Sequence, residues 1–519
     1  MKRIFSYSFI MASLLFASCD DGTIDHDDVY IPDPVEETDE DDGISLEPTT
    51  ANIIRIKTAD ENRHQVIDGF GCAFAEWSHR IWNNNLREDV VEALFGKTGL
   101  NLNIFRGEVF PHYQDPETGA IEFWGANNGN YNLPANAPAM INNYWRSYHG
   151  HECGEQVQLG QMWLTDIIAK KYPHVRNIYS IWSPPASMKS NGSSSGGSLK
   201  EGCEQEYADY LLDFINEYEK KFGIKVYAIS PSNEPNSGGT GWNGCSWKID
   251  TKLAEFCAET LRNTLDNGGH QDVHIIYGEH SWWSGLSSVE KGIKNYDMKN
   301  KNIITAAHGY LTSDNSIKDS EIIREEGFHI WNTELSWTDT YDPSWKDAMK
   351  RANTFHRYFV NANLNALVWW AGARPCSNNE SLIKLEEALP GTSYEITGRY
   401  YAYGQYSKHI SVGSIRYDAE KEVTEGDEFA LNDDVLVSSY INNETDTYTF
   451  VITNNSETKG FEAKLEVEGR EFQNMISYTS DEGVKWQRKK INPSISGLRA
   501  VTIPKYSIVT VTGKLKPVE

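Results

Sequence analysis

Two short stretches of the chain place a glutamate where a strand would give way to a loop. Glu234 follows the apolar run 226–230, and Glu334 closes the run 328–334, which is rich in aromatic and β-branched residues. Hydrolysis of a glycosidic bond uses two carboxyl groups that flank it, one as general acid and one as base or nucleophile. Glu234 and Glu334 are therefore candidates for such a pair.

The two glutamates lie 100 residues apart in the sequence. This gap accommodates three β/α units of about 35 residues each, the repeat of an eight-fold barrel. We expect Glu234 and Glu334 at the ends of strands four and seven, on the same face. Glu279, at the end of the candidate fifth strand, is the main rival carboxylate, but it lacks the asparagine that precedes Glu234.

From residue 66 to 405, strand-like apolar runs alternate with amphipathic segments, the pattern of β/α repetition. Eight strands are expected, at residues 67–72, 101–106, 177–183, 225–233, 273–279, 303–308, 328–334 and 366–370. Helices are expected at residues 87–95, 159–172, 204–222, 251–267 and 344–361, while the helix between strands five and six has the weakest pattern. Long insertions at 108–151 and 190–202 fall after strands two and three, where loops of a barrel determine specificity.

The pattern changes after residue 405 to short alternating runs separated by turn signals, which indicates a β-sandwich over residues 406–519. A strand within residues 49–65, upstream of the barrel, is expected to join this sandwich. The predicted fold is thus of the α/β class, a (β/α)8 TIM barrel with a fused antiparallel side β-sandwich.

The first 19 residues have the features of a targeting segment. Lys2 and Arg3 precede the apolar run 4–16, which is too short to span a membrane, and small residues lead to Cys19. This order resembles a bacterial lipobox, in which Cys19 receives the lipid. It predicts an outer-membrane lipoprotein, exposed on the cell surface, whereas an ordinary cleaved signal is the alternative.

Residues 20–48 are predicted to form an acidic, disordered tether. Residues 20–42 hold twelve Asp and Glu and no Lys or Arg, and the segment lacks a hydrophobic period. The whole chain carries a net charge of −26, which argues against a nucleic-acid partner because phosphates attract basic proteins. A monomer is expected.

Six cysteines follow Cys19, at positions 72, 153, 203, 245, 257 and 376. An exported protein can pair them, but the sequence does not choose between disulfides and buried free thiols. Their spacing lacks the Cys/His pattern of a zinc site. Two carboxyl groups suffice for glycoside hydrolysis, so neither a metal nor an organic cofactor is expected.

Several motifs together resemble glycoside hydrolase family 30, over about residues 50 to 519. The matching stretches are residues 66–71 (Val-Ile-Asp-Gly-Phe-Gly), 182–189 (Trp-Ser-Pro-Pro-Ala-Ser-Met-Lys), 232–235 (Ser-Asn-Glu-Pro), 331–334 (Trp-Asn-Thr-Glu) and 368–370 (Val-Trp-Trp). The resemblance implies a retaining enzyme with a barrel and a side β-sandwich. Glu234 would be the acid/base and Glu334 the nucleophile.

The resemblance also implies roles for residues around the pair. Asn233 would hydrogen-bond the 2-hydroxyl of the sugar, and Arg106 would keep the nucleophile ionised. The remaining side chains end strands three, six and eight and would wall the sugar site: Trp182, His308, Tyr310 and Trp370. A barrel salt bridge for Arg106 and core packing for the aromatic residues are the structural alternatives.

Arg374 bears on the substrate. The xylanase branch of the family, which recognises glucuronic acid, carries adjacent arginines after the Trp-Trp of strand eight, whereas this chain has one, Arg374. It would bind a uronate carboxylate as a bidentate fork, unless it is solvated or paired with Glu380. Trp242 and Asn243, after the acid/base, also resemble that branch and its β-1,6-galactanase relatives.

The sequence as a whole predicts a retaining endo-β-glycosidase that degrades a plant polysaccharide, with (glucurono)xylan favoured. The alternatives within the family are a β-1,6-glucanase or galactanase and a glucosylceramidase-like exo-glycosidase. A non-catalytic glycan-binding lipoprotein is the alternative of another class. Decay to such a protein would remove a carboxylate or its asparagine, and Asn233, Glu234 and Glu334 are all present.

Overall fold

The computed structural model describes residues 52–75, 77–109, 156–193, 195–238, 244–423, 434–491 and 499–517, together with the backbone of 112–114 and 121–123. Only the backbone is described at 156–159, 423 and 499. The predicted leader with Cys19, the tether, most of the insertion at 108–151 and the pair Trp242-Asn243 lie outside these residues. The chain divides into the units Met1–Asp39 and Glu40–Glu519, and all described residues belong to the second unit.

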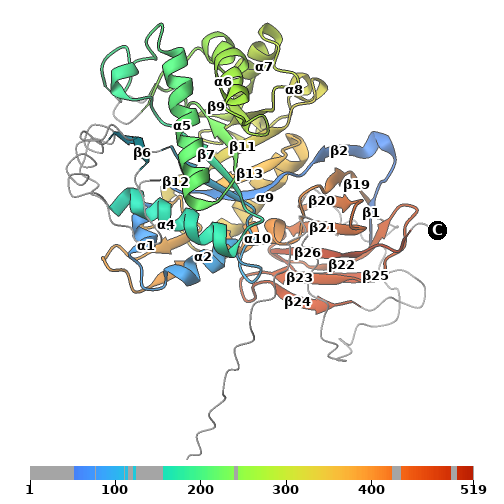
Figure 1. Cartoon of the computed structure of the whole chain (residues 1–519). Coiled ribbons are helices and arrows are strands. Elements are labelled where there is room, and N and C mark those ends of the chain that lie inside the picture. The colour runs from blue at the N-terminus through green and yellow to red at the C-terminus, as the bar shows by residue number, and fades with distance from the viewer. Residues whose placement is uncertain are drawn as a thin grey trace, which may run out of the picture. The chain divides into compact units, whose positions relative to one another are not determined.

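Eight parallel strands close into a barrel, which confirms the predicted fold class (Figure 1). In order around the barrel they are β3 (Gly69–Ala73), β4 (Ile104–Glu108), β7 (Arg176–Ser180), β8 (Val226–Ser230), β9 (His274–His280), β10 (Ile303–Ala307), β11 (Ile330–Leu335) and β13 (Ala366–Trp369). Each overlaps one of the eight strands expected from the sequence. β3, β4, β10, β11 and β13 are buried throughout, as expected for strands covered on both faces.

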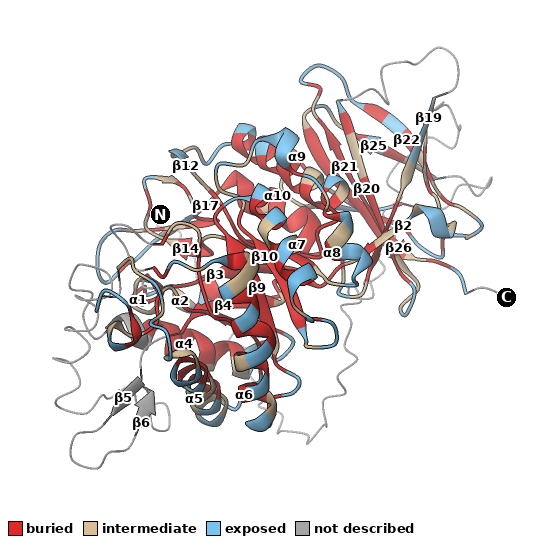
Figure 2. Cartoon of the chain, turned by 90° about the horizontal axis from the view of Figure 1, so that it is seen from above, coloured by how far each residue is buried: buried red, intermediate tan, exposed pale blue. Residues whose placement is uncertain are grey.

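Helices follow the barrel strands and cover them (Figures 1 and 2). They are α1 (Ser78–Trp82), α2 (Arg87–Phe95), α4 (Gln156–Lys171), α5 (Glu204–Phe222), α6 (Arg262–Asn267), α7 (Leu286–Asn295), α8 (Glu321–Glu325), α9 (Trp345–Asn361) and α10 (Gly398–Ser407). Most expose one side and bury the other, as in α5, which buries Tyr207, Leu211 and Phe214. α5 ends at Gly223, whose φ of 66° suits the left-handed position that terminates a helix.

The helix expected at 251–267 is not a continuous α-helix. It consists of two π-helical segments, η3 (Ile249–Leu253) and η4 (Phe256–Leu261), followed by α6. π-helical turns are rare and occur mostly as short segments inside α-helices, so a helical hydrophobic pattern does not predict them. Short 3-10 turns lie at η1 (Asp60–Asn62), η2 (Ala186–Met188), η5 (Trp283–Gly285) and η6 (Asp314–Ser316).

Short strands decorate the barrel outside its closed sheet. They form three small sheets: β5 (His112–Gln114) with β6 (Ile121–Phe123), β12 (Trp337–Thr340) with β15 (Asn378–Asn379), and β14 (Ala373–Arg374) with β16 (Ile383–Leu385) and β17 (Tyr394–Ile396). The last two sheets build up the loops that follow the seventh and eighth barrel strands.

The sandwich consists of two sheets. The first has the order β19 (Ala419–Val423), β1 (Asn52–Ile56), β22 (Phe461–Val467), β25 (Arg499–Ile503). The second has the order β2 (Arg63–Val66), β18 (Ile415–Tyr417), β20 (Val435–Asn442), β21 (Thr447–Asn454), β26 (Ser507–Lys514), β23 (Ile476–Ser480), β24 (Gln487–Lys490). As expected, a strand from upstream of the barrel, β1, lies in the sandwich.

One detail of the sandwich differs from the sequence-based expectation. β1 pairs in parallel with β22, so the sandwich is not wholly antiparallel. The residue pairs that meet there are more than 400 positions apart, as in Ile54 opposite Leu465, and no local sequence pattern predicts the relative direction of two such strands. Pro504, which cannot donate to a ladder, separates β25 from β26.

The barrel and the sandwich each have a hydrophobic core, and a shared cluster joins them. Tyr440, Val451 and Ile508 of the sandwich pack in the same cluster as residues of α9 and α10. Five cysteines in the described part of the chain are free thiols, at positions 72, 203, 245, 257 and 376. Within the described ranges, no helix combines the length and the apolar character needed to cross a bilayer.

Candidate active site

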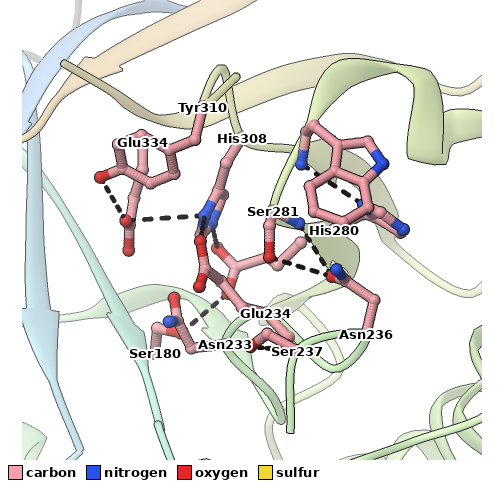
Figure 3. Close-up of polar contacts among 12 residues, drawn as sticks. Ser180, Asn233, Glu234, Asn236, Ser237, His280, Ser281, His308, Tyr310 and Glu334 are labelled. Carbon is pink, nitrogen blue, oxygen red and sulfur yellow. Dashed lines mark hydrogen bonds and ion pairs between the residues drawn. The ribbon is translucent and has the colours of Figure 1, made fainter. Parts of the chain in front are cut away.

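Five of the predicted site residues meet at the carboxyl ends of the barrel strands: Asn233, Glu234, His308, Tyr310 and Glu334 (Figure 3). Arg106 lies in β4 and Glu334 in β11, whereas Asn233 and Glu234 follow β8 and His308 follows β10. Because all eight strands run in one direction, their ends meet on one face of the barrel. Residues from distant parts of the chain are thereby brought into contact.

Glu334 is held from three sides. Arg106 Nη1 donates to its Oε1 at 2.7 Å, and the Tyr310 hydroxyl donates to its Oε2 at 2.8 Å. His308 Nδ1 lies 3.5 Å from the same Oε2. Glu334 is buried, with 3% of its surface exposed, so these bonds fix its carboxylate in one orientation.

Glu234 occupies a less enclosed position. Its side chain is 16% exposed, and its Oε1 lies 3.2 Å from His308 Nδ1. The backbone at Glu234 has a φ of 46°, a left-handed conformation that costs a non-glycine residue energy and is found mainly where a function needs it. A hydrogen bond from Glu234 N to the carbonyl oxygen of Glu279, at 3.1 Å, holds this turn.

The two glutamates face each other closely. One oxygen of Glu234, one oxygen of Glu334 and a ring nitrogen of His308 all lie within 4.8 Å of one another. Retaining glycosidases place their carboxyl groups about 5–5.5 Å apart, whereas inverting enzymes need about 6.5–9.5 Å to admit a water molecule. The two carboxyl groups are thus close enough to act on one glycosidic bond.

Asn233 is oriented by the same arginine that holds Glu334. Arg106 Nη2 donates to Asn233 Oδ1 at 2.9 Å. Because the amide oxygen is engaged, the orientation of the amide is fixed, and its nitrogen is the group that can donate to a sugar hydroxyl. Arg106 also lies 5.3 Å from the centroid of the Trp182 ring, in a cation–π contact.

A third carboxylate, Glu279, lies beneath the pair and is completely buried. Its Oε2 accepts from Ser180 at 2.8 Å and from Ser230 at 2.7 Å, and its Oε1 lies 3.3 Å from Arg106 Nη2. Burial opposes its charge, but Arg106, His308 and the hydroxyl donors outweigh burial and lower the pKa of Glu279 to about 2. Glu279 is therefore a permanent anion in the wall of the site.

His308 is the second cation of the site. Burial alone would lower its pKa, but the surrounding Glu334, Glu234 and Glu279 raise it to about 9. The positive charges of Arg106 and His308 offset the negative charges of Glu279 and Glu334. Such balance is what a buried charge cluster needs.

The pKa of Glu334 departs from the sequence-based expectation. Arg106 was expected to hold this pKa low, but burial raises it above the ordinary value of 4.5 and outweighs the lowering by His308 and Arg106. The negative charges of Glu234 and Glu279 nearby raise it further. Burial also raises the pKa of Tyr310 well above its ordinary value, so its hydroxyl stays a donor to Glu334.

Glu234, His308 and Glu334 are also close enough to hold a cation. A metal-bound imidazole must be neutral, because the lone pair of its ring nitrogen forms the bond. In the structure these side chains contact one another directly, with His308 Nδ1 at 3.2 Å from Glu234 Oε1 and at 3.5 Å from Glu334 Oε2.

Three tryptophans form an aromatic wall beside the site. Trp370 contacts Trp77 at 4.6 Å and Trp182 at 5.8 Å between ring centroids. Arg374 lies over the Trp77 ring at 4.8 Å, and its Nη1 is 3.4 Å from Glu380 Oε2. The structure thus gives Arg374 the ion pair that was the alternative to uronate binding.

Comparison with known proteins gives matches to enzymes that act on glycans. The family model described as Glycosyl hydrolase family 59 matches residues 147–386, less than half of the chain. The chain is 27% identical over 271 residues to glucuronoxylanase XynC of Bacillus subtilis (strain 168), covering 50% of this chain and 56% of that protein. It is 22% identical over 393 residues to an endo-1,6-beta-D-glucanase of Neurospora crassa, covering 72% of this chain and 76% of that protein.

Among solved structures, the catalytic domain of the GH30 xylanase C from Talaromyces cellulolyticus superposes with a TM-score of 0.70 and 21% identity, covering 90% of this chain and all of that one. This chain is similar to glycoside hydrolases. The similarity to the solved structure supports the barrel and the side β-sandwich. The chain spans about half the length of the curated xylanases that it matches.

Some residues of the site were not anticipated from the sequence. Ser180 and Ser230 are single serines at strand ends, and only their shared contact with Glu279 sets them apart. Trp77 lies just after the first barrel strand, and its position in that loop was the one sequence feature that could have indicated a place in the site.

Lys189, in the motif at 182–189, is buried. It donates to Ser183 Oγ at 2.9 Å and to the carbonyl oxygen of Gly244 at 2.6 Å, and it thereby connects the loops after strands three and four.

Proposed function

We propose that this protein is a retaining β-glycosidase of the family 30 type that works by double displacement. The observation that carries the proposal is the pair of glutamates at the ends of β8 and β11, with oxygens within 4.8 Å of each other. Their surroundings differ as the two roles require. Glu334 is enclosed by three donors, whereas Glu234 is more open and lies where a departing sugar can reach it.

In the first step, a carboxylate oxygen of Glu334 bonds to the anomeric carbon while the glycosidic bond breaks. Glu234 gives its proton to the departing oxygen. In the second step, Glu234 takes a proton from a water molecule, whose oxygen bonds to the anomeric carbon and releases Glu334. The Tyr310 hydroxyl and Arg106 orient Glu334 for attack, and Asn233 is placed to bind the 2-hydroxyl.

We propose a β-linked plant polysaccharide as the substrate, with (glucurono)xylan as the first candidate. The sequence similarity to a glucuronoxylanase supports this candidate. The position of Arg374 does not add to it, because the guanidinium is engaged by Glu380 and Trp77. A β-1,6-glucan is the second candidate, since the similarity to an endo-1,6-beta-D-glucanase covers more of both chains.

The test is to incubate the purified chain, without residues 1–19, with xylans, β-1,6-glucan, β-1,6-galactan and glucosylceramide. Proton NMR of the first product distinguishes the mechanisms, because retention releases the β-anomer before it mutarotates. Initial release of the α-anomer would contradict the retaining mechanism. Failure to cleave any glycan, with binding retained, would favour a glycan-binding protein instead.

We also propose that Cys19 anchors the protein in the outer membrane, facing outward. The support is the order of the first 19 residues: two basic residues, an apolar run, then small residues before the cysteine. Replacement of Cys19 by alanine should abolish incorporation of radiolabelled palmitate. A labelled Cys19→Ala protein would contradict the anchor.

A further inference from the structure

Two large apolar side chains are exposed on the rim that carries the site. Trp282, just after β9, is 39% exposed, and Leu311, shortly after β10, is 93% exposed. In the described part of the chain, three other large apolar residues are exposed, at 36% for Leu86, 48% for Leu389 and 38% for Val412, and Leu311 exceeds all of them. Burial of such side chains stabilises a fold, so packing does not explain why Trp282 and Leu311 face solvent.

The two side chains are presented by neighbouring loop tips. Trp283 N donates to Thr312 Oγ1 at 3.2 Å. Trp282 directly precedes the donor residue, and Leu311 directly precedes the acceptor residue. Leu311 also has a φ of 49°, which is unfavourable for a leucine. An exposed leucine held in a strained conformation indicates that its outward position serves a function.

The Trp282 loop is tied to the segment that carries Glu234. Asn236 Oδ1 accepts hydrogen bonds from Ser281 N at 2.9 Å and from Ser281 Oγ at 3.2 Å (Figure 3). His280 supports the indole of Trp282, with ring centroids 4.8 Å apart, and its carbonyl oxygen accepts from His308 N at 2.8 Å. Trp282 is thereby placed on the side of the proposed acid rather than at the Trp77–Trp370 wall.

The geometry points to a leaving-group subsite formed by Trp282 and Leu311, which holds the sugar unit that departs with the proton of Glu234. The inference rests on the proposed glycosidase function, because in that reaction the acid protonates the oxygen of the leaving group. The indole would stack on the apolar face of the sugar ring, and Leu311 would cover its edge. The polar groups of His280, Ser281 and Asn236 border the indole and suit sugar hydroxyls.

Among the described residues, this site is too polar for a lipid leaving group. A hydrocarbon chain needs a continuous apolar surface, and surfaces that bind such partners extend over several hundred Å². Here two apolar side chains stand beside serine, asparagine and histidine. The expected occupant is therefore a further sugar residue of a glycan chain, and cleavage within a chain follows from it.

The experiment compares two substrates that share the glycone. One is an oligosaccharide whose leaving group is a sugar, and the other is the corresponding glycosyl fluoride, whose leaving group is too small to reach Trp282. In Trp282→Ala the ratio of kcat/KM for the oligosaccharide to kcat/KM for the fluoride should fall about 10-fold, the scale of one lost aromatic contact. Leu311→Ala should lower the same ratio by a smaller factor.

Val412→Ala is the matched control. Val412 is 38% exposed, like Trp282, but the next residue, Gly413, donates to the carbonyl oxygen of Ile67, ahead of the first barrel strand and far from the site. In Val412→Ala the ratio of kcat/KM for the oligosaccharide to kcat/KM for the fluoride should equal that of the parent protein. An equal loss on both substrates in Trp282→Ala would show that the indole is only structural and would overturn the subsite.

A binding measurement separates this inference from the proposed function. If the parent protein cleaves neither substrate, the proposed function fails, and the subsite is then tested by calorimetric titration with the same oligosaccharide. Weaker binding by Trp282→Ala than by Val412→Ala supports the subsite even without turnover. Equal binding by both variants overturns it, as does tighter binding of an alkyl glycoside than of the oligosaccharide.

Discussion

At the scale of single residues, the site is a set of opposite charges arranged around two carboxyl groups with different tasks. Arg106 contacts Asn233, Glu279 and Glu334 at once, so one guanidinium positions an amide, a buried anion and the proposed nucleophile. His308 lies between the two glutamates of the pair. The roles of Glu234 and Glu334 follow from these contacts, and each can be tested separately.

Replacement of Glu334 by glutamine should abolish turnover of every substrate, because the covalent intermediate can no longer form. Replacement of Glu234 by alanine should slow hydrolysis of natural glycans by about 10²–10⁴-fold, the usual contribution of a general acid. Glycosides with good leaving groups should still react in Glu234→Ala, and added azide should give a β-glycosyl azide. An α-azide from this variant would mean that the two roles are exchanged.

Glu279 and Arg106 should shift the acidic limb of the pH profile in opposite directions. The negative charge of Glu279 raises the pKa of Glu334, whereas the positive charge of Arg106 lowers it. Glu279→Gln should therefore move the acidic limb of kcat/KM to lower pH, and Arg106→Ala should move it to higher pH. Shifts of the same sign in the two variants would contradict this electrostatic arrangement.

The stability of the protein should depend on pH through His308. Its pKa rises from 6.5 to about 9 on folding, so its contribution is fully present below pH 6.5 and is lost as the pH rises through 9. The difference in unfolding free energy between the parent and His308→Asn should thus shrink over this range, by on the order of 3 kcal/mol. Urea titrations at several pH values measure it.

His409→Asn is the control for that experiment. His409 is buried as well, but burial lowers its pKa to about 3, so it is neutral in both states above pH 7. Its effect on the free energy of unfolding should be constant between pH 7 and 9. A constant difference for His308→Asn as well would mean that His308 is not a buried cation.

At the scale of elements, the sequence predicted what depends on local pattern. α2 and α5 begin and end at the predicted residues, because their hydrophobic period is clear and Gly96 and Gly223 follow them. All eight barrel strands were anticipated from short apolar runs. The π turns of η3 and η4 were not, since such turns are rare and occur as short segments within helical patterns.

The arrangement of side chains was harder to predict than the elements that carry them. Strand ends indicated that Arg106, Glu234 and Glu334 would meet, because parallel strands bring their ends together. The ion pair of Arg374 with Glu380 depends on the path of a loop. The pKa of Glu334 is raised by burial and by the negative charge of Glu279. Neither effect can be predicted from the spacing of residues in the sequence.

Lys189 gives a test at this scale. Its Nζ bridges the loops after strands three and four by bonds to Ser183 and Gly244, and Lys189→Met would remove both bonds. We expect a loss of about 1–3 kcal/mol in unfolding free energy, the cost of a buried polar group left unsatisfied. Lys200→Met is the control, because Lys200 is exposed and should matter by about 0.5 kcal/mol or less.

At the scale of the whole molecule, the sandwich is built from both sides of the barrel in sequence. β1 and β2 precede the first barrel strand, whereas the other sandwich strands follow α10. α10 carries much of the contact between the two parts. Gln405 Nε2 donates to Ser480 Oγ at 2.8 Å. The backbone carbonyl oxygen of Gln405 accepts from Thr510 Oγ1 at 2.7 Å.

These contacts predict that barrel and sandwich unfold together. The buried cluster shared by Tyr440, Val451 and Ile508 with the barrel helices is continuous with the barrel core, so separating the two parts would expose apolar surface on each, at about 25 cal/mol per Å². Heating should give one calorimetric transition, and loss of activity should coincide with loss of the sandwich signal. Gln405→Ala should lower the midpoint of that single transition, because it removes the buried hydrogen bonds of Gln405 Nε2 to Ser480 Oγ and to the carbonyl oxygen of Ile508. Two separate transitions in the parent protein, with activity retained after the first, would show instead that the barrel does not need the sandwich.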